Sequence, residues 1–221
     1  MADFGIVFDC DGTLLDTIGV WREAERELYR RAGAAPAPGD HAIIVTLTLP
    51  EVGEFFHDRY GLGSSAADVS RLLEGILIDF YETKAAARPG ALEFVQMLAD
   101  RGVPMSVASS SPQAFLQAGL AGAGFLPYMK AVVSVDDVGS SKREPAVYDR
   151  ARAAIGTDRA HTWGFEDSLY AVRTLKRAGY PTIGVYDCDE SGPYADLARE
   201  ADIAIRDYSE LSFDRLAAIA R

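Results

Sequence analysis

The chain has 221 residues, of which 48% are hydrophobic and 25% charged, and a formal net charge of −11. This composition is typical of a globular protein with a sizeable core. The acidic balance, without a Lys/Arg-rich run, argues against binding to nucleic acid or to a membrane surface. No apolar run approaches the roughly 20 residues of a membrane span, and the two cysteines, Cys10 and Cys188, form no disulfide framework. We therefore expect a cytoplasmic protein, a monomer or weak dimer.

The first predicted element is a strand over residues 4–8, which ends in Asp9-Cys10-Asp11-Gly12-Thr13. An apolar strand that ends in two carboxylates brings acid groups to the edge of a sheet, where open α/β sheets bind their ligands. Taken alone, the segment is equally well explained as a turn, because Asp-Gly is a common turn pair. Cys10 is expected to pack as a small apolar residue rather than to act as a nucleophile.

Residues 16–85 are predicted to form a helical insert. Three segments in it have apolar residues at helical spacing, over 21–31, 50–60 and 65–84. The insert would divide the rest of the chain into 1–15 and 86–221, with joints near residues 15–19 and 85–89. Two connections at one sheet edge form a natural hinge over a site at that edge.

From residue 88 onward, predicted strands alternate with predicted helices. This order predicts an α/β fold with a parallel sheet covered by helices on both faces. Ser111-Pro112 is interpreted as an N-cap followed by proline at the first helical position. The predicted strands are 103–108, 131–134, 161–165, 182–186 and 203–205, and the predicted helices are 90–98, one from 112, 146–154, 168–178, one near 194–200 and one at the end.

Two further polar groups follow predicted strands. Ser109 is a hydroxyl at a strand end beside a helix N-terminus, where it can bind a phosphate oxygen. Ser111 is better explained as the helix cap. Lys142 lies in the loop before the helix at Pro145. It is either a solvated surface charge or the cation that neutralises a phosphoryl group and keeps Asp9 ionised.

A second pair of acids, Glu166-Asp167, follows the strand over 161–165. One of these acids could simply be favoured by the dipole of the next helix. That explanation does not cover four carboxylates at two strand ends. Together with Asp9 and Asp11, the pair forms an oxygen-rich cluster suited to Mg²⁺.

In this order, the motifs resemble those of the haloacid dehalogenase superfamily, over nearly the whole chain. The matching residues are Asp9-x-Asp11-Gly12-Thr13, Ser109, Lys142-x-x-Pro145 and Glu166-Asp167-Ser168. The position of the insert is similar to that in members with a cap between the first two motifs. The resemblance implies a Rossmann-like core with a mobile helical cap, Mg²⁺ as cofactor and a small phosphorylated metabolite as substrate.

The resemblance also implies residue roles. Asp9 would be the nucleophile that forms an aspartyl-phosphate, and Asp11 the general acid and then the general base. Asp9, Asp11 through its backbone carbonyl, Glu166 and Asp167 would hold the metal. The residues implied in phosphate binding are Gly12, Ser109, Ser110 and Lys142.

Asp11 favours phosphate esters over carbon–halogen bonds, because a leaving alkoxide needs a proton. Residues 108–112 and 165–168 look most like the branch that contains β-phosphoglucomutase and sugar-phosphate phosphatases. The cap arginine with which the mutase binds a second phosphate has no counterpart in residues 45–50. The predicted function is therefore a Mg²⁺-dependent phosphatase, with a phosphomutase and a catalytically idle binding protein as alternatives.

Substrate specificity is expected to come from the cap. The predicted residues are Trp21, His41 and Thr46, although Trp21 is equally well explained as part of the cap's own core.

Overall fold

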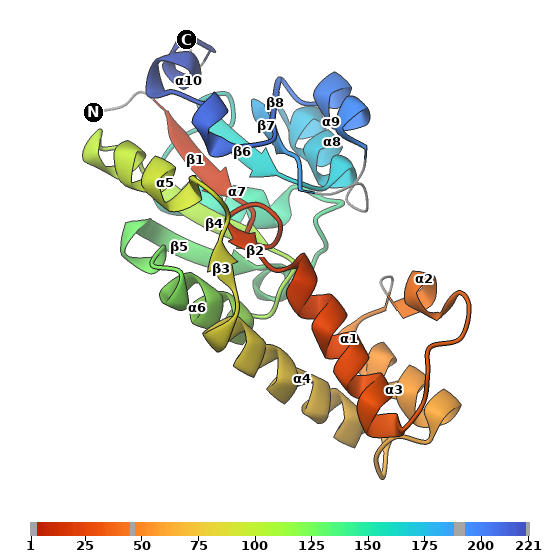
Figure 1. Cartoon of the computed structure of the whole chain (residues 1–221). Coiled ribbons are helices and arrows are strands. Elements are labelled where there is room, and N and C mark those ends of the chain that lie inside the picture. Colours follow the sequence, from red (N-terminus) through yellow and green to blue (C-terminus); the bar gives the residue numbers. More distant parts are fainter. Residues whose placement is uncertain (1–3, 45–46, 188–192, 220–221) are drawn as a thin grey trace. The chain divides into compact units, whose positions relative to one another are not determined.

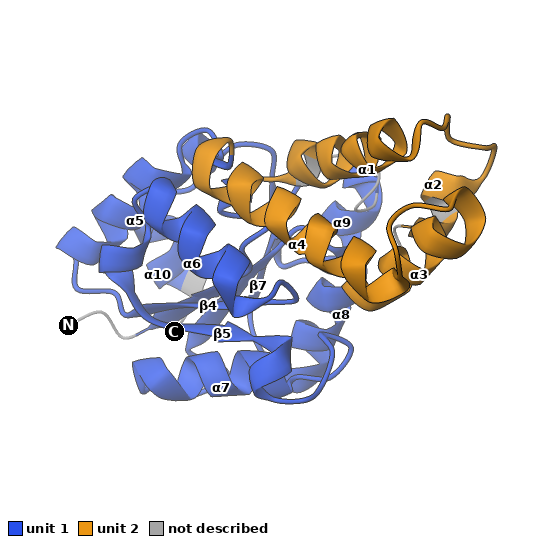
Figure 2. Cartoon of the chain, turned by 90° about the horizontal axis from the view of Figure 1, so that it is seen from below, with its two compact units in different colours: residues 1–16, 85–221 blue, residues 17–84 orange. Residues whose placement is uncertain are grey.

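The chain divides into two compact units (Figure 2). The computed structural model describes residues 4–44, 47–187 and 193–219. One unit, the core unit, comprises residues 1–16 and 85–221, and the other, the insert, comprises residues 17–84. The insert therefore interrupts the core unit in sequence, and it separates the first strand of the main sheet from the other five strands of that sheet.

The core unit is built on a six-stranded parallel sheet with the strand order β5-β4-β1-β6-β7-β8 (Figure 1). Strand β1 lies between β4 and β6, so the loop after β1 emerges between the loops of these two neighbours. Because all six strands are parallel, their carboxyl ends share one edge of the sheet. The strands are β1 (Gly5–Phe8), β4 (Met105–Ser109), β5 (Met129–Ser134), β6 (Thr162–Glu166), β7 (Thr182–Val185) and β8 (Ile203–Ile205).

Helices cover both faces of this sheet, as predicted. Alternate strand residues point to opposite faces. Val7 belongs to a buried cluster with residues of α7 and α8. Phe8 packs instead against Phe165, whose ring centroid lies 5.9 Å from that of Phe94 in α5. The helices of the core unit are α5 (Ala91–Asp100), α6 (Gln113–Gly122), α7 (Ala146–Ile155), α8 (Leu169–Ala178), α9 (Tyr194–Glu200) and α10 (Phe213–Ile219).

Two local expectations differ from the structure. Helix α6 begins at Gln113, and Pro112 occupies the N-cap position without a side-chain cap hydrogen bond, so the capping role predicted for Ser111 is wrong. The joints of the insert carry a two-residue antiparallel pair that no pattern predicted, between β2 (Leu15–Asp16) and β3 (Ala86–Ala87). A strand of two residues is too short to show, in the sequence, the alternation of apolar and polar residues that identifies a strand.

Over the described residues of the insert, all regular secondary structure is helical. Helices α3 and α4 approach closely at Gly53, where an added Cβ would lie 2.6 Å from the carbonyl oxygen of Ala66. Among the described residues of the whole chain, no helix has both the length and the apolar composition needed to cross a membrane. The helices of the insert are α1 (Ile18–Ala32), α2 (Asp40–Ile44), α3 (Leu49–Tyr60) and α4 (Ala66–Thr83).

The short helix α2 is held in the insert by the buried carboxylate of Asp40. Its Oδ2 accepts hydrogen bonds from the hydroxyls of Tyr29, at 3.0 Å, and Tyr60. The backbone N–H of Ala37 also donates to this oxygen at 2.9 Å, and Arg59 pairs with Oδ1 at 3.0 Å. These donors, led by the Tyr60 hydroxyl, hold the pKa of Asp40 below its ordinary value.

Candidate active site

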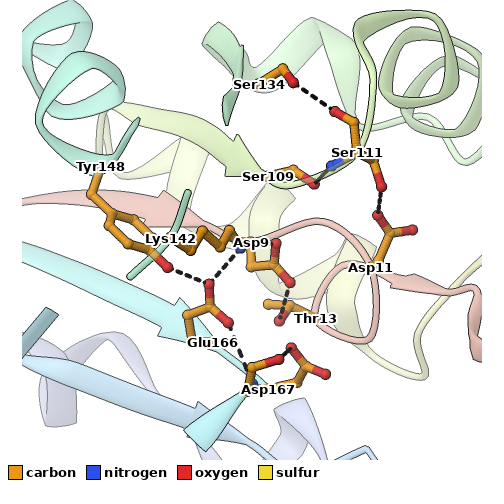
Figure 3. Close-up of polar contacts among 11 residues, drawn as sticks. Asp9, Asp11, Thr13, Ser109, Ser111, Ser134, Lys142, Tyr148, Glu166 and Asp167 are labelled. Carbon is orange, nitrogen blue, oxygen red and sulfur yellow. Dashed lines mark hydrogen bonds and ion pairs between the residues drawn. The ribbon is translucent and has the colours of Figure 1, made fainter. Parts of the chain in front are cut away.

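The centre of the candidate site is Asp9, the first residue after β1. Its carboxylate is almost fully buried, as is the ammonium of Lys142. The Nζ of Lys142 contacts Asp9 Oδ1 and lies 2.5 Å from Oε1 of Glu166, the last residue of β6 (Figure 3). Asp9 and Glu166 meet because β1 and β6 are neighbours, whereas Lys142 comes from the loop between β5 and α7.

The ionisable groups at this centre lie close enough together to shift one another's pKa. Burial raises the pKa of Asp9 well above its ordinary range, the ammonium of Lys142 opposes this rise, and the carboxylates of Glu166 and Asp167 add to it. Burial alone would lower the pKa of Lys142, but Asp9 and Glu166 raise it, so the amine is protonated at neutral pH. A second positive charge at this place would favour the ionised form of Asp9.

Asp9, Glu166 and Asp167 form a group that fits a divalent cation. Each offers a carboxylate oxygen, and these oxygens lie within 4.8 Å of one another. All three residues are buried, and the ammonium of Lys142 pairs with the carboxylates of Asp9 and Glu166. Carboxylate oxygens are the ligands that Mg²⁺ prefers in proteins. The side chain of Asp11 is not part of this group.

Gly12 lies in the loop between β1 and β2. Its φ is +77°, which an L side chain rarely adopts. An added Cβ would lie 2.7 Å from Oδ2 of Asp167. The N–H of Gly12 donates to the carbonyl of Leu15 at 2.8 Å, and the part in phosphate binding that the resemblance implies for Gly12 stays a prediction. What Gly12 provides is room for Asp167.

Two serines at strand ends, Ser109 in β4 and Ser134 in β5, form hydrogen bonds with the backbone of Ser111. Ser109 Oγ, which is buried, accepts a hydrogen bond from the Ser111 N–H at 3.1 Å. The hydroxyl of Ser111 donates to Oδ2 of Asp11 at 2.6 Å, and the hydroxyl of Ser134 donates to the Ser111 carbonyl at 2.9 Å (Figure 3). Ser110, by contrast, is exposed. Sequence reasoning explained Ser111 as a helix cap, because Ser111-Pro112 resembles a helix start, and it did not single out Ser134.

Two tyrosines that sequence reasoning did not single out also support the site. The buried hydroxyl of Tyr148, in α7, donates to Oε1 of Glu166 at 2.6 Å. The buried hydroxyl of Tyr208 donates to the carbonyl of Thr13 at 3.0 Å. No sequence pattern distinguishes a tyrosine with such a partner from one that simply fills a core, because both contacts depend on how distant elements pack.

The specificity residues predicted in the insert stay predictions. Trp21 in α1 is 36% exposed, and its Nε1 donates to the hydroxyl of Tyr81 at 3.2 Å. The Nδ1 of His41 in α2 lies 2.7 Å from Glu25 Oε2. Thr46 lies outside the described residues.

The fold and the candidate site together define an α/β enzyme with a buried acidic group at the carboxyl edge of its parallel sheet. The model of the haloacid dehalogenase-like hydrolases matches residues 5–179, and the chain belongs to this family. This finding confirms the resemblance drawn from the four motifs.

Named relatives align with most of the chain. The validoxylamine A 7'-phosphate phosphatase of Streptomyces hygroscopicus subsp. limoneus is 26% identical, over 95% of this chain and 96% of that protein. The fructose-1-phosphate phosphatase YqaB of Escherichia coli is also 26% identical, over 82% and 95% respectively. The crystal structure of β-phosphoglucomutase from Clostridium difficile shares the fold, with a TM-score of 0.74 and 17% identity, over 100% of this chain and 97% of that one.

Proposed function

We propose that this protein is a Mg²⁺-dependent phosphatase that hydrolyses a small, sugar-phosphate-like monoester through an aspartyl-phosphate. The observation that carries the proposal is the buried group in which Asp9 contacts Lys142 and shares a 4.8 Å cluster with Glu166 and Asp167. The names of the two phosphatase relatives support the reaction and the class of substrate. The family implies hydrolysis, and the acidic group offers a carboxylate nucleophile and carboxylate ligands for Mg²⁺.

In the first step, a carboxylate oxygen of Asp9 bonds to phosphorus while the bond from phosphorus to the ester oxygen breaks. Lys142 fixes the orientation of Asp9, and its ammonium has three N–H donors, of which two go to Asp9 and Glu166. We assign the third to a phosphate oxygen, together with the hydroxyl of Ser109. Phosphoryl transfer mostly needs such positioning and charge neutralisation.

The metal would be held by Asp9, Glu166, Asp167 and the backbone carbonyl of Asp11. When bound, Mg²⁺ supplies positive charge that shields the anionic nucleophile from the anionic phosphate. Tyr148 and Lys142 both donate to Glu166 Oε1, so they orient its carboxylate whether or not it touches the metal directly.

Asp11 would act first as a general acid and then as a general base. It gives a proton to the ester oxygen as the alcohol leaves, and then takes one from the water that attacks the aspartyl-phosphate. General acid–base catalysis of this kind contributes about 10²- to 10⁴-fold to the rate.

We assign substrate choice to the insert as a cap, with Trp21, His41 and Thr46 as the residues to vary. The mutase alternative shares the fold, so only activity separates the two. A mutase would convert β-glucose 1-phosphate to the 6-phosphate faster than it releases inorganic phosphate, and that result would overturn the proposal of a phosphatase.

The central test uses the full chain with p-nitrophenyl phosphate and a panel of sugar phosphates, with Mg²⁺ or with a chelator. We expect turnover that depends on Mg²⁺, a phosphoenzyme trapped by acid quench, and a loss of about 10³-fold or more in kcat for Asp9→Asn. Asp149→Asn is the matched control, because this carboxylate of α7 pairs with Arg159 and lies outside the cluster. Equal kcat values for wild type and Asp9→Asn would refute the mechanism.

A further inference from the structure

The hydrogen bond between Ser111 and Asp11 links the candidate general acid to the loop after β4. The two residues follow neighbouring strands, β4 and β1, and the donor–acceptor distance from Ser111 Oγ to Asp11 Oδ2 is 2.6 Å (Figure 3). Ser111 itself is only 7% exposed. A short hydrogen bond from a buried donor to a carboxylate is of the stronger, charge-assisted kind.

The backbone of Ser111 is held on both sides, which fixes the position of its hydroxyl. Its N–H donates to Ser109 Oγ at 3.1 Å, and its carbonyl accepts from the buried hydroxyl of Ser134 at 2.9 Å. Ser134 is in turn held by a capping box with Asp137, whose carboxylate accepts from the Ser134 N–H at 2.8 Å. These contacts tie Ser111 to the ends of two strands, so its hydroxyl presents a rigid donor to Asp11.

We propose that Ser111 is a positioning residue that orients Asp11 for general acid–base catalysis. This inference rests on the proposed function, in which Asp11 protonates the leaving oxygen. A protonated carboxyl group has one oxygen that donates and one that accepts. Because the Ser111 hydroxyl donates to Oδ2, Oδ2 is the accepting oxygen and the transferable proton belongs on Oδ1.

A bond forms between a carboxylate oxygen of Asp9 and phosphorus, and the bond between phosphorus and the ester oxygen breaks. The proton on Oδ1 of Asp11 moves to that ester oxygen, the product leaves as an alcohol, and Asp11 is left as a carboxylate. Loss of the Ser111 hydroxyl removes the hydrogen bond that holds Oδ2 of Asp11, and the acid then loses part of its alignment with the leaving oxygen.

The consequence depends on the leaving group. An alkoxide needs the proton as it departs, whereas p-nitrophenolate is a stable anion and needs it little. Misalignment of the acid should therefore slow the hydrolysis of an alkyl phosphate and spare that of p-nitrophenyl phosphate. Loss of phosphate binding or of overall folding would slow both.

The experiment compares kcat/KM for an alkyl phosphate, the best sugar phosphate of the panel, with kcat/KM for p-nitrophenyl phosphate in one enzyme preparation. For Ser111→Ala we expect the alkyl-to-aryl ratio to fall by about 10- to 100-fold, the range that a small misplacement costs. Ser111→Thr, which keeps a hydroxyl, should restore part of the ratio. Ser106→Ala is the matched control: it removes a buried hydroxyl of β4 that donates to the Ala151 carbonyl at 3.0 Å, and it should leave the ratio unchanged.

Two outcomes overturn the inference. In one, the rates for both substrates fall equally in Ser111→Ala, which is the result of a structural or phosphate-binding role. In the other, the ratio of Ser111→Ala equals that of wild type. Failure of the proposed function looks different, because wild type itself would then hydrolyse neither ester in a Mg²⁺-dependent way.

Discussion

Replacement of Gly12 by alanine tests whether the loop after β1 keeps Asp167 in the acidic group. The alanine Cβ would lie 2.7 Å from Oδ2 and 3.0 Å from Cγ of Asp167. These atoms belong to the end of a side chain, so the carboxylate can move away. That movement takes it out of the group in which carboxylate oxygens of Asp9, Glu166 and Asp167 lie within 4.8 Å.

Two effects of different size follow from this geometry. A left-handed backbone costs an L residue roughly 1–2 kcal/mol. In a chain of this length, that corresponds to a fall in Tm of roughly 2–8 °C. Displacement of a metal-binding carboxylate should in addition weaken Mg²⁺ binding by about 10- to 100-fold, the range seen when the support of a ligand is lost.

Gly156→Ala separates the two effects. Gly156 follows α7 with a φ of +76°, nearly that of Gly12, but an added Cβ would meet nothing within 4 Å. Both variants should therefore lose stability to a similar extent, and only Gly12→Ala should lose affinity for Mg²⁺. Thermal unfolding without metal and calorimetric titration with Mg²⁺ measure the two quantities. Equal Mg²⁺ affinities in the two variants would refute the reasoning.

Two further predictions concern stability. The hydrogen bond from Tyr60 helps to hold the pKa of Asp40 below its ordinary value of 3.8, so the ionised carboxylate stabilises the fold above that pH, and the contribution is lost as the pH falls through the lowered pKa. Asp40→Asn should thus unfold at lower urea concentration at pH 7, with a difference from wild type that narrows below pH 3.8; a constant difference would contradict this. Tyr208→Phe removes the donor to the buried Thr13 carbonyl and should cost about 1–3 kcal/mol in urea unfolding, whereas a midpoint equal to that of wild type would show that this hydrogen bond contributes nothing.

Much of the core unit could be predicted from local patterns. The parallel sheet follows from alternating apolar runs and amphipathic segments, and the helix over 194–200 and the strand over 203–205 have the predicted bounds. The prediction around Ser111 was wrong, because a serine before a proline is a good helix start in isolation. Its hydroxyl had a stronger acceptor available in the carboxylate of Asp11, which is 100 residues away in sequence.

The sequence by itself determined the chemical groups and the strand ends that carry them. Asp9 and Glu166 end or follow strands in which every residue is buried, so their carboxylates emerge at the sheet edge whatever the strand order. Tertiary structure decided which groups meet. The order β5-β4-β1-β6 brings Asp9 beside Glu166 and Ser111 beside Asp11, and a loop brings Lys142 to both acids. Contacts between residues so distant in sequence depend on the packing of the whole sheet, because no local pattern encodes which strands become neighbours.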